Sequence, residues 1–395
     1  MFEGLNQINW KNVGYHIWGN DSEYLEEIPQ KLRDLISPNQ EKREFAIEYV
    51  LGEKGTFGII CDTTPYILPF IIKLIDNPET PERFILADYL LRVMDNLLAT
   101  DNISITEMRL YLHVYDSISG NLHTLLKLMN DDDYNIQISA IETLGKLTSH
   151  AESLLTELFN QLNLNENENR QVEILKSIKR LLSSLDPWKQ VKTKEKFALA
   201  LRDIVNNAQS LKIKIAAASA SIETFILNRR DKMIISELVP ELLSQEFSKR
   251  HFNHQFSNFY WKGQLDYSIS LIRDLARIGN EPLLSLLQNP ELDAIQSQLV
   301  VRGLFANILL NRDENVYWNS NMSHTDIGLF YLPVNRTGDY RVFITNKDNT
   351  IFFKQILETV IENSKVWEMP TNMFSFFFGL PDSKEGLQKV LNNIV

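Results

Sequence analysis

Residues 67–94 read ILPFIIKLIDNPETPERFILADYLLRVM, two apolar runs separated by a polar break. Apolar residues of the first run recur three and four positions apart, which places them along one face of a helix: Ile67, Phe70, Ile71, Leu74 and Ile75. Asp76-Asn77-Pro78 stops that helix, and the same spacing resumes from Phe84 to Met94. The stretch therefore predicts a helical hairpin.

The same unit recurs along the 395 residues. Clear copies span 28–50, 122–147 and 283–305, and weaker copies span 154–182, 197–227 and 238–278. One hairpin cannot bury both of its faces alone, so hairpins repeated every few tens of residues predict a stacked α-solenoid. A content of only 15 Gly and 13 Pro disfavours an all-β sandwich. We therefore expect an all-α, right-handed solenoid of roughly six or seven hairpins.

Three hairpins carry a motif in which a Leu-rich helix end and a polar turn precede an Arg or Gln and then an Ala. It stands as Leu35-Ile36-Ser37-Pro38 with Arg43 and Ala46, as Leu74-Ile75-Asp76-Asn77-Pro78 with Arg83 and Ala87, and as Leu128-Met129-Asn130-Asp131 with Gln137 and Ala140. This motif resembles the HEAT repeat. The resemblance implies a protein that works by binding another macromolecule.

Motifs near both ends resemble a group of bacterial HEAT-repeat proteins of unassigned function. These motifs are Tyr15–Gly19, Ile28-Pro29, Gly55-Thr56, Pro65–Phe70 and Gly379–Glu385. This chain has Glu53-Lys54 where the group has His-Gln, so any chemical role of that His is lost here. Pro29 is expected in the first turn of its helix, where its missing N–H costs nothing.

We expect one continuous domain with three parts. Residues 1–311 form the solenoid, 312–349 a polar loop insertion with a possible short strand at 340–345, and 350–395 a C-terminal helical cap. The insertion is either an ordered binding loop or a simple connector. The aromatic cluster around Phe374–Phe378 either covers the last repeat or forms a partner groove.

Charge narrows the class of partner. The net charge of −11 disfavours nucleic acid, although residues 185–262 hold 13 Lys and Arg against 8 Asp and Glu. Those residues are either solvated helix faces or an anion-facing patch. A single cysteine, Cys61, no signal peptide and no membrane-spanning run point to the cytoplasm.

The sequence contains no clear catalytic, metal or cofactor site. His251 and His254 are spaced for one helix face, but no zinc-protease Glu follows them. Gly-rich phosphate loops, a G-x-S-x-G elbow and the His-Glu pairs of di-iron HEAT-repeat hydroxylases are missing. Cys61 is either a small core residue or a thiol near a helix start. We expect no enzyme, no metal and no cofactor.

The favoured function is therefore a protein-binding scaffold or adaptor, such as an immunity-like inhibitor of a basic toxin. The alternative is an enzyme accessory or lyase that acts on a chromophore or another small ligand, as HEAT-repeat chromophore lyases do. Large aromatic side chains are favoured anchors for protein partners. The candidate binding residues, each of which has a core position as its alternative, are Trp10, Tyr15, Trp18, Lys54, Tyr260, Trp261 and Trp318.

Overall fold

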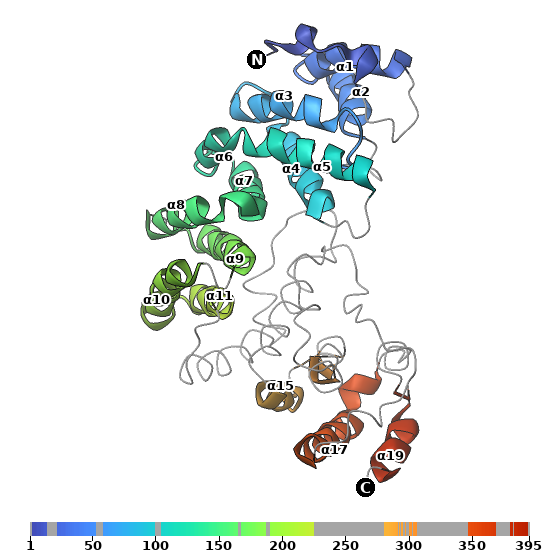
Figure 1. Ribbon diagram of the computed structural model, residues 1–395, viewed down its shortest axis with the longest axis vertical. Coiled ribbons are helices and arrows are strands. Elements are labelled where there is room, and N and C mark those ends of the chain that lie inside the picture. The colour runs from blue at the N-terminus through green and yellow to red at the C-terminus, as the bar shows by residue number, and fades with distance from the viewer. Residues whose placement is uncertain are drawn as a thin grey trace. The chain divides into compact units, whose positions relative to one another are not determined.

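The computed structural model describes residues 2–13, 22–52, 58–98, 104–164, 167–186, 190–224, 280–290, parts of 292–305, 347–368 and 380–393 without 382. All regular secondary structure within these ranges is helical (Figure 1). The predicted all-helical fold of HEAT-like hairpins is confirmed. The chain divides into two compact units, the first built from residues up to Leu185 and the second from Asp186 onwards.

Within the described residues, the first unit contains four helical hairpins and one additional helix. The hairpins are α1 (Ser22–Asp34) with α2 (Gln40–Leu51), α3 (Thr64–Asp76) with α4 (Arg83–Leu98), α6 (Leu122–Leu128) with α7 (Tyr134–Lys146), and α8 (Ala151–Leu164) with α9 (Glu168–Ser184). The additional helix, α5 (Ile105–Ser119), packs against α3 and α4. Short 3-10 turns precede α1 at Leu5–Gln7 and Trp10–Asn12.

The second helices of three successive hairpins pack side by side in this unit, because α7 contacts both α4 and α9. The motif alanines lie in this packing: Ala46 is fully buried, and Ala87 and Ala140 are nearly so. Gly145 of α7 approaches α9 so closely that an added Cβ would lie 2.6 Å from Ser177 Cβ. Small residues in the second helices, such as Gly145, therefore set how closely neighbouring helices pack.

Polar turn residues begin the second helix of three hairpins. Asn39 accepts a hydrogen bond from the Lys42 amide at 3.1 Å, Asp133 accepts one from the Asn135 amide at 2.8 Å, and Asn167 caps α9 in the same way. Each side chain satisfies an amide that has no partner within the helix. The breaks that predicted the hairpins are thus also their N-caps.

Two helix starts differ from the sequence expectation. Helix α1 begins at Ser22, so Pro29 lies inside the helix and not in its first turn as expected. Helix α17 begins at Lys347, inside the stretch 312–349 that was expected to be a loop, whereas the helical cap was expected from residue 350. The first turn of α17 is too polar to show a periodic apolar face, so the pattern reveals only its later turns. In α1, Leu25 already lies on the buried face with Ile28 and Leu32, so the apolar pattern allows an earlier start than the one expected.

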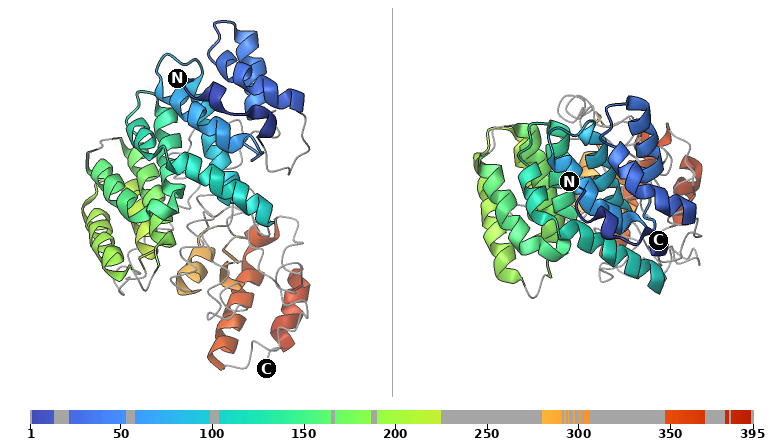
Figure 2. Two further views of the ribbon diagram at one scale, coloured as in Figure 1. Left: turned by 45° about the horizontal axis from the view of Figure 1, so that its top comes forward. Right: turned by 90° about the horizontal axis from the view of Figure 1, so that it is seen from above.

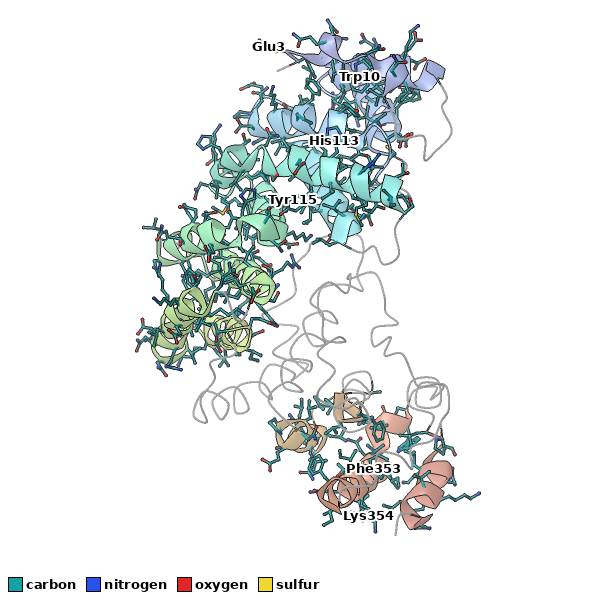
Figure 3. All side chains as sticks on the ribbon, viewed as in Figure 1. Glu3, Trp10, His113, Tyr115, Phe353 and Lys354 are labelled. Carbon is teal, nitrogen blue, oxygen red and sulfur yellow. The ribbon has the colours of Figure 1, made fainter. Side chains whose placement is uncertain are left out.

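Within the second unit, α10 (Val191–Asn207) and α11 (Leu211–Ile222) form a further hairpin. Helix α17 (Lys347–Glu362) packs against α15 (Asn280–Leu287) and α19 (Lys384–Asn393). The Asn363 side-chain amide donates to the Leu287 carbonyl at 2.7 Å. Phe353, which is labelled in Figure 3, meets Phe305 edge to face. Helix α17 therefore packs on α15, and α19 packs on α17. The expected hairpin at 238–278, the strand at 340–345 and the boundary at 311 lie outside the described residues.

Candidate protein-binding surface

Side chains from the second helices join successive hairpin turns in the first unit. The Arg43 guanidinium donates to the Ser37 carbonyl of its own turn at 2.9 Å and pairs with Glu82 of the next turn at 3.2 Å. Arg83 repeats this arrangement one hairpin later, donating to the Ile75 carbonyl at 2.7 Å and forming a two-point pair with Asp131. Both arginines stand at the predicted HEAT-motif position.

The third and fourth hairpins continue this series. The Gln137 amide donates to the Asp131 carbonyl of its own turn. Arg170 donates to the Met129 carbonyl at 2.5 Å and to Asn130 Oδ1 at 2.6 Å, both in the preceding turn. We call Arg43, Arg83, Gln137 and Arg170 with their partners the turn ladder. It ties four hairpins into one frame through charge-assisted hydrogen bonds.

The turn ladder leaves one edge of the unit mostly acidic, because its arginines are used inside the chain. Each hairpin presents an exposed carboxylate at this edge: Glu41, Glu79, Asp132 and Glu168. Of the nearby exposed lysines, Lys127 is paired with Asp76 at 2.6 Å, and Lys42 stands beside Glu41. Residues 1–185 hold 16 Lys and Arg against 28 Asp and Glu, whereas the rest of the chain holds 24 against 23. The negative charge of the protein therefore resides in this unit.

Two exposed phenylalanines accompany these carboxylates. Phe45 lies one helical turn after Glu41 and is 53% exposed, and Phe84 follows the ladder residue Arg83 and is 48% exposed. The Lys31 ammonium lies 4.5 Å from the centre of the Phe45 ring, which is a cation–π contact that holds the ring in place. The four carboxylates and these two rings are called the turn edge below. Aromatic groups rimmed by charge are typical of protein-binding surfaces.

Helix α5 forms a second distinct surface and lies outside the two-helix pattern (Figure 2). A capping box fixes its start: Ser104 accepts from the Glu107 amide at 3.2 Å, and Glu107 accepts from the Ser104 amide at 2.8 Å. Hydrogen bonding of the Glu107 carboxyl to the Ser104 side chain, and then to the Ser104 backbone amide, lowers the pKa of this carboxyl. On its inner side the Ser117 hydroxyl donates to the Pro65 carbonyl at 2.8 Å, and the His113 ring packs edge to face on Tyr66 (Figure 3).

Charged side chains also line the contacts among α4, α7 and α9. The Lys146 ammonium is buried and pairs with Asp95 at 2.5 Å, and Glu173 pairs with Lys176 at 2.7 Å. Burial lowers the pKa of Lys146, which Asp95 partly offsets. Burial, reinforced by the nearby Glu173 carboxylate, raises the pKa of Glu142. These groups are held between scaffold helices, so we assign them to the scaffold and not to a ligand site.

Trp10 is the one candidate binding residue that the structure describes, and it occupies the core position that was its alternative. The side chain is 6% exposed, and its indole N–H donates to the Leu5 carbonyl at 3.0 Å (Figure 3). Both its apolar surface and its polar group are satisfied within the fold, as the core alternative required. Tyr15, Trp18, Lys54, Tyr260, Trp261 and Trp318 lie outside the described residues, as do His251 and His254.

Cys61 is partly buried at the start of α3, where its sulfur lies 3.2 Å from the Thr63 hydroxyl and 3.3 Å from that of Thr64. In the part of the chain that the structure describes, no three His, Cys, Asp or Glu side chains gather in a way that suits a metal ion. None of the described helices is long and apolar enough to cross a membrane.

Sequence reasoning missed both surfaces. The signal for α5 was available, because Ser104 and Glu107 have the S-x-x-E spacing of a capping box ahead of an apolar run. The turn edge had no such signal. Its acidity depends on arginines turning inward, which only the three-dimensional contacts reveal.

No family model matches the sequence, and no match to it was found among curated proteins. Solved structures similar to it include a chain of the Kap95:Nup1 complex, at 12% identity and a TM-score of 0.41, where the match covers 93% of this chain and 51% of that chain. An engineered protein solved by crystallography matches at 13% identity and a TM-score of 0.33, covering 93% and 98% of the two chains. This chain thus spans about half the length of the first, and TM-scores this low carry no functional meaning.

Proposed function

We propose that this chain is a non-enzymatic scaffold that binds a basic protein through the turn edge of its first unit. The observation that carries the proposal is the turn ladder, which uses the arginines internally and leaves a carboxylate exposed at every turn. A basic surface approaching this edge finds complementary charge at repeated positions and two exposed aromatic rings. A basic toxin that the chain binds and holds inactive is one protein with the required charge.

The turn edge suits a protein partner better than a small ligand, because its groups are spread over four hairpins and are not gathered in one pocket. Electrostatic complementarity of this kind speeds association and depends on salt. We therefore expect a complex that forms readily at low ionic strength and weakens as salt is raised.

The test is capture of partners by the tagged full chain from its own cell extract at low and high salt, read by mass spectrometry. The proposal predicts one basic protein in near-equal amount, lost at high salt. It also predicts loss of that protein with the double substitution Glu79→Lys and Asp132→Lys, at two exposed positions of the turn edge.

The matched control is Glu281→Lys with Glu385→Lys, which makes the same change of charge at two exposed positions of the second unit. This control is expected to retain the partner. If the tagged chain captures no basic protein at either salt concentration, or if both double variants capture it equally, the proposed role of the turn edge is wrong.

A further inference from the structure

Helix α5 is apolar on two opposite sides. Its inner side buries Leu110, Val114 and Ile118 within the first unit. Its outer side exposes Ile105 by 75%, Met108 by 49% and Leu112 by 58%. Because Ile105, Met108 and Leu112 are spaced three and four residues apart, they lie along one line on the helix, which we call the outer stripe. A rigid helix that shows such a stripe to water marks a contact surface.

One flank of the outer stripe carries two opposite charges. Arg109 and Asp116 are both exposed and stand seven residues, or two helical turns, apart, so they lie on the same flank. Their side chains make no hydrogen bond or ion pair within the described residues. The flank therefore has a positive point toward the N-terminal end of the helix and a negative point toward its C-terminal end.

We propose that the outer stripe binds the outer stripe of a second copy of this chain, with the two α5 helices antiparallel about a twofold axis near Leu112. In an antiparallel pair related by such an axis, the same flank of each helix lies on the same side of the contact. Arg109 of each copy then faces Asp116 of the other, and the two Leu112 side chains meet near the axis. A parallel pair would bring opposite flanks together and leave both charges unmatched.

The charge of the stripe favours this occupant over a basic protein. Arg109 and Asp116 cancel, and the Glu107 carboxylate is held by the Ser104 capping box. The outer side of α5 therefore has no net charge, although the rest of the unit is acidic. When a second copy of the helix runs in the opposite direction, its negative group lies opposite the positive group of the first copy. A surface that matches itself in this way is what a twofold contact requires.

A single helix pair buries less area than the roughly 1,200 to 2,000 Å² of a stable interface, so we expect a weak dimer that depends on concentration. The test is sedimentation velocity of the full chain over a concentration series. Leu112→Glu is expected to raise the dimer Kd by about a hundredfold. Leu199→Glu, at a leucine of α10 that is 63% exposed, is the matched control and is expected to leave the Kd unchanged.

Charge exchange tests the antiparallel geometry. Arg109→Asp alone and Asp116→Arg alone each place like charges opposite one another, and each is expected to raise the Kd about tenfold or more. An equimolar mixture of these two variants, and the variant carrying both changes, restore opposite charges and should recover dimer formation. Helix content by circular dichroism checks that every variant is folded.

A chain that stays monomeric at all concentrations, or a dimer that survives Leu112→Glu, would overturn the proposal. A dimer that Leu112→Glu abolishes but that neither the mixture nor the double variant restores would overturn the antiparallel pairing and point to another occupant of the stripe. This inference does not rest on the proposed function, because the turn-edge variants Glu79→Lys and Asp132→Lys are expected to dimerise normally.

Discussion

Helices α7 and α5 belong to the same unit and have similar lengths, 13 and 15 residues, but they are used in opposite ways. Helix α7 packs against α4 on one side and α9 on the other, and most of its residues are buried. Helix α5 buries one line of side chains and leaves an apolar line exposed. The repeat helices thus stabilise the fold, whereas the additional helix α5 exposes an apolar surface for contact with another molecule.

The largest effect is expected where α7 meets α9. An Ala at Gly145 would place its Cβ 2.6 Å from Ser177 Cβ and 2.9 Å from Ser177 Cα, so the two helices must separate. We expect Gly145→Ala to lower the free energy of unfolding by about 2 to 3 kcal/mol, measured by urea titration with circular dichroism. At Gly120, at the end of α5, an added Cβ meets only the Asp116 carbonyl, at 3.1 Å. We therefore expect Gly120→Ala to change the free energy of unfolding by less than about 1 kcal/mol. Equal losses would show that α7 is no more tightly packed than α5.

The turn ladder gives the next largest effect. Arg83 and Asp131 are 12% and 13% exposed, so Arg83→Ala leaves a carboxylate without its partner in a mostly buried position. We expect a loss of about 2 kcal/mol in thermal or urea unfolding. Lys127→Ala removes a lysine that is 63% exposed and should cost about 0.5 kcal/mol or less. If the two variants are equally stable, the ladder does not hold the hairpins together.

The capping box should have a smaller and more local effect. Ser104→Ala removes the acceptor of the Glu107 amide and is expected to cost about 1 kcal/mol. The loss should appear as faster hydrogen exchange in the first turn of α5, with α7 unchanged. Ser153→Ala removes an exposed hydroxyl bonded only to the His150 carbonyl and serves as the control. If Ser104→Ala speeds hydrogen exchange in α7 as well as in α5, then α5 is part of the packed repeat helices.

The smallest effect is a difference in pH dependence between two glutamates. The pKa of Glu142 in α7 is raised, so its protonated form stabilises the fold at low pH and this contribution is lost as the pH rises through the folded pKa. The pKa of Glu107 in α5 is lowered, so its contribution is present above the unfolded pKa and is lost as the pH falls through the folded pKa.

Glutamine substitutions separate these two cases. Relative to the wild type, Glu142→Gln should be more stable at pH 7 than it is at pH 4, and Glu107→Gln should be less stable at pH 7 than at pH 4. Urea unfolding at the two pH values measures both. Changes of the same sign in the two variants would contradict the different environments assigned to these carboxyl groups.

The sequence predicts the repeat layer well because its signals are local. The spacing of apolar residues and the Arg, Gln and Ala of the motif identify the second helices, and the same arginines form the turn ladder. Helix α5 was not predicted, because the repeat pattern contains only two helices in each unit and α5 is a third. Apolar residues on both of its sides also blur the single stripe that marks an amphipathic helix.

Aromatic residues show why a binding site cannot be predicted from residue type. Trp10 resembles a partner anchor in the sequence, yet its indole reaches back to the Leu5 carbonyl and fills the core. The more modest Leu112 and Met108 remain exposed. Burial depends on contacts between distant segments, which the sequence pattern does not contain.

The most direct test of the contrast between the two helices is one substitution made in both. Leu144 of α7 is fully buried, and Leu112 of α5 is 58% exposed. In urea unfolding under identical conditions, Leu144→Ala should lose about 3 to 4 kcal/mol, and Leu112→Ala should change the free energy of unfolding by no more than about 0.5 kcal/mol. A comparable loss in both variants would show that α5 is part of the packed scaffold and would contradict its role as a contact surface.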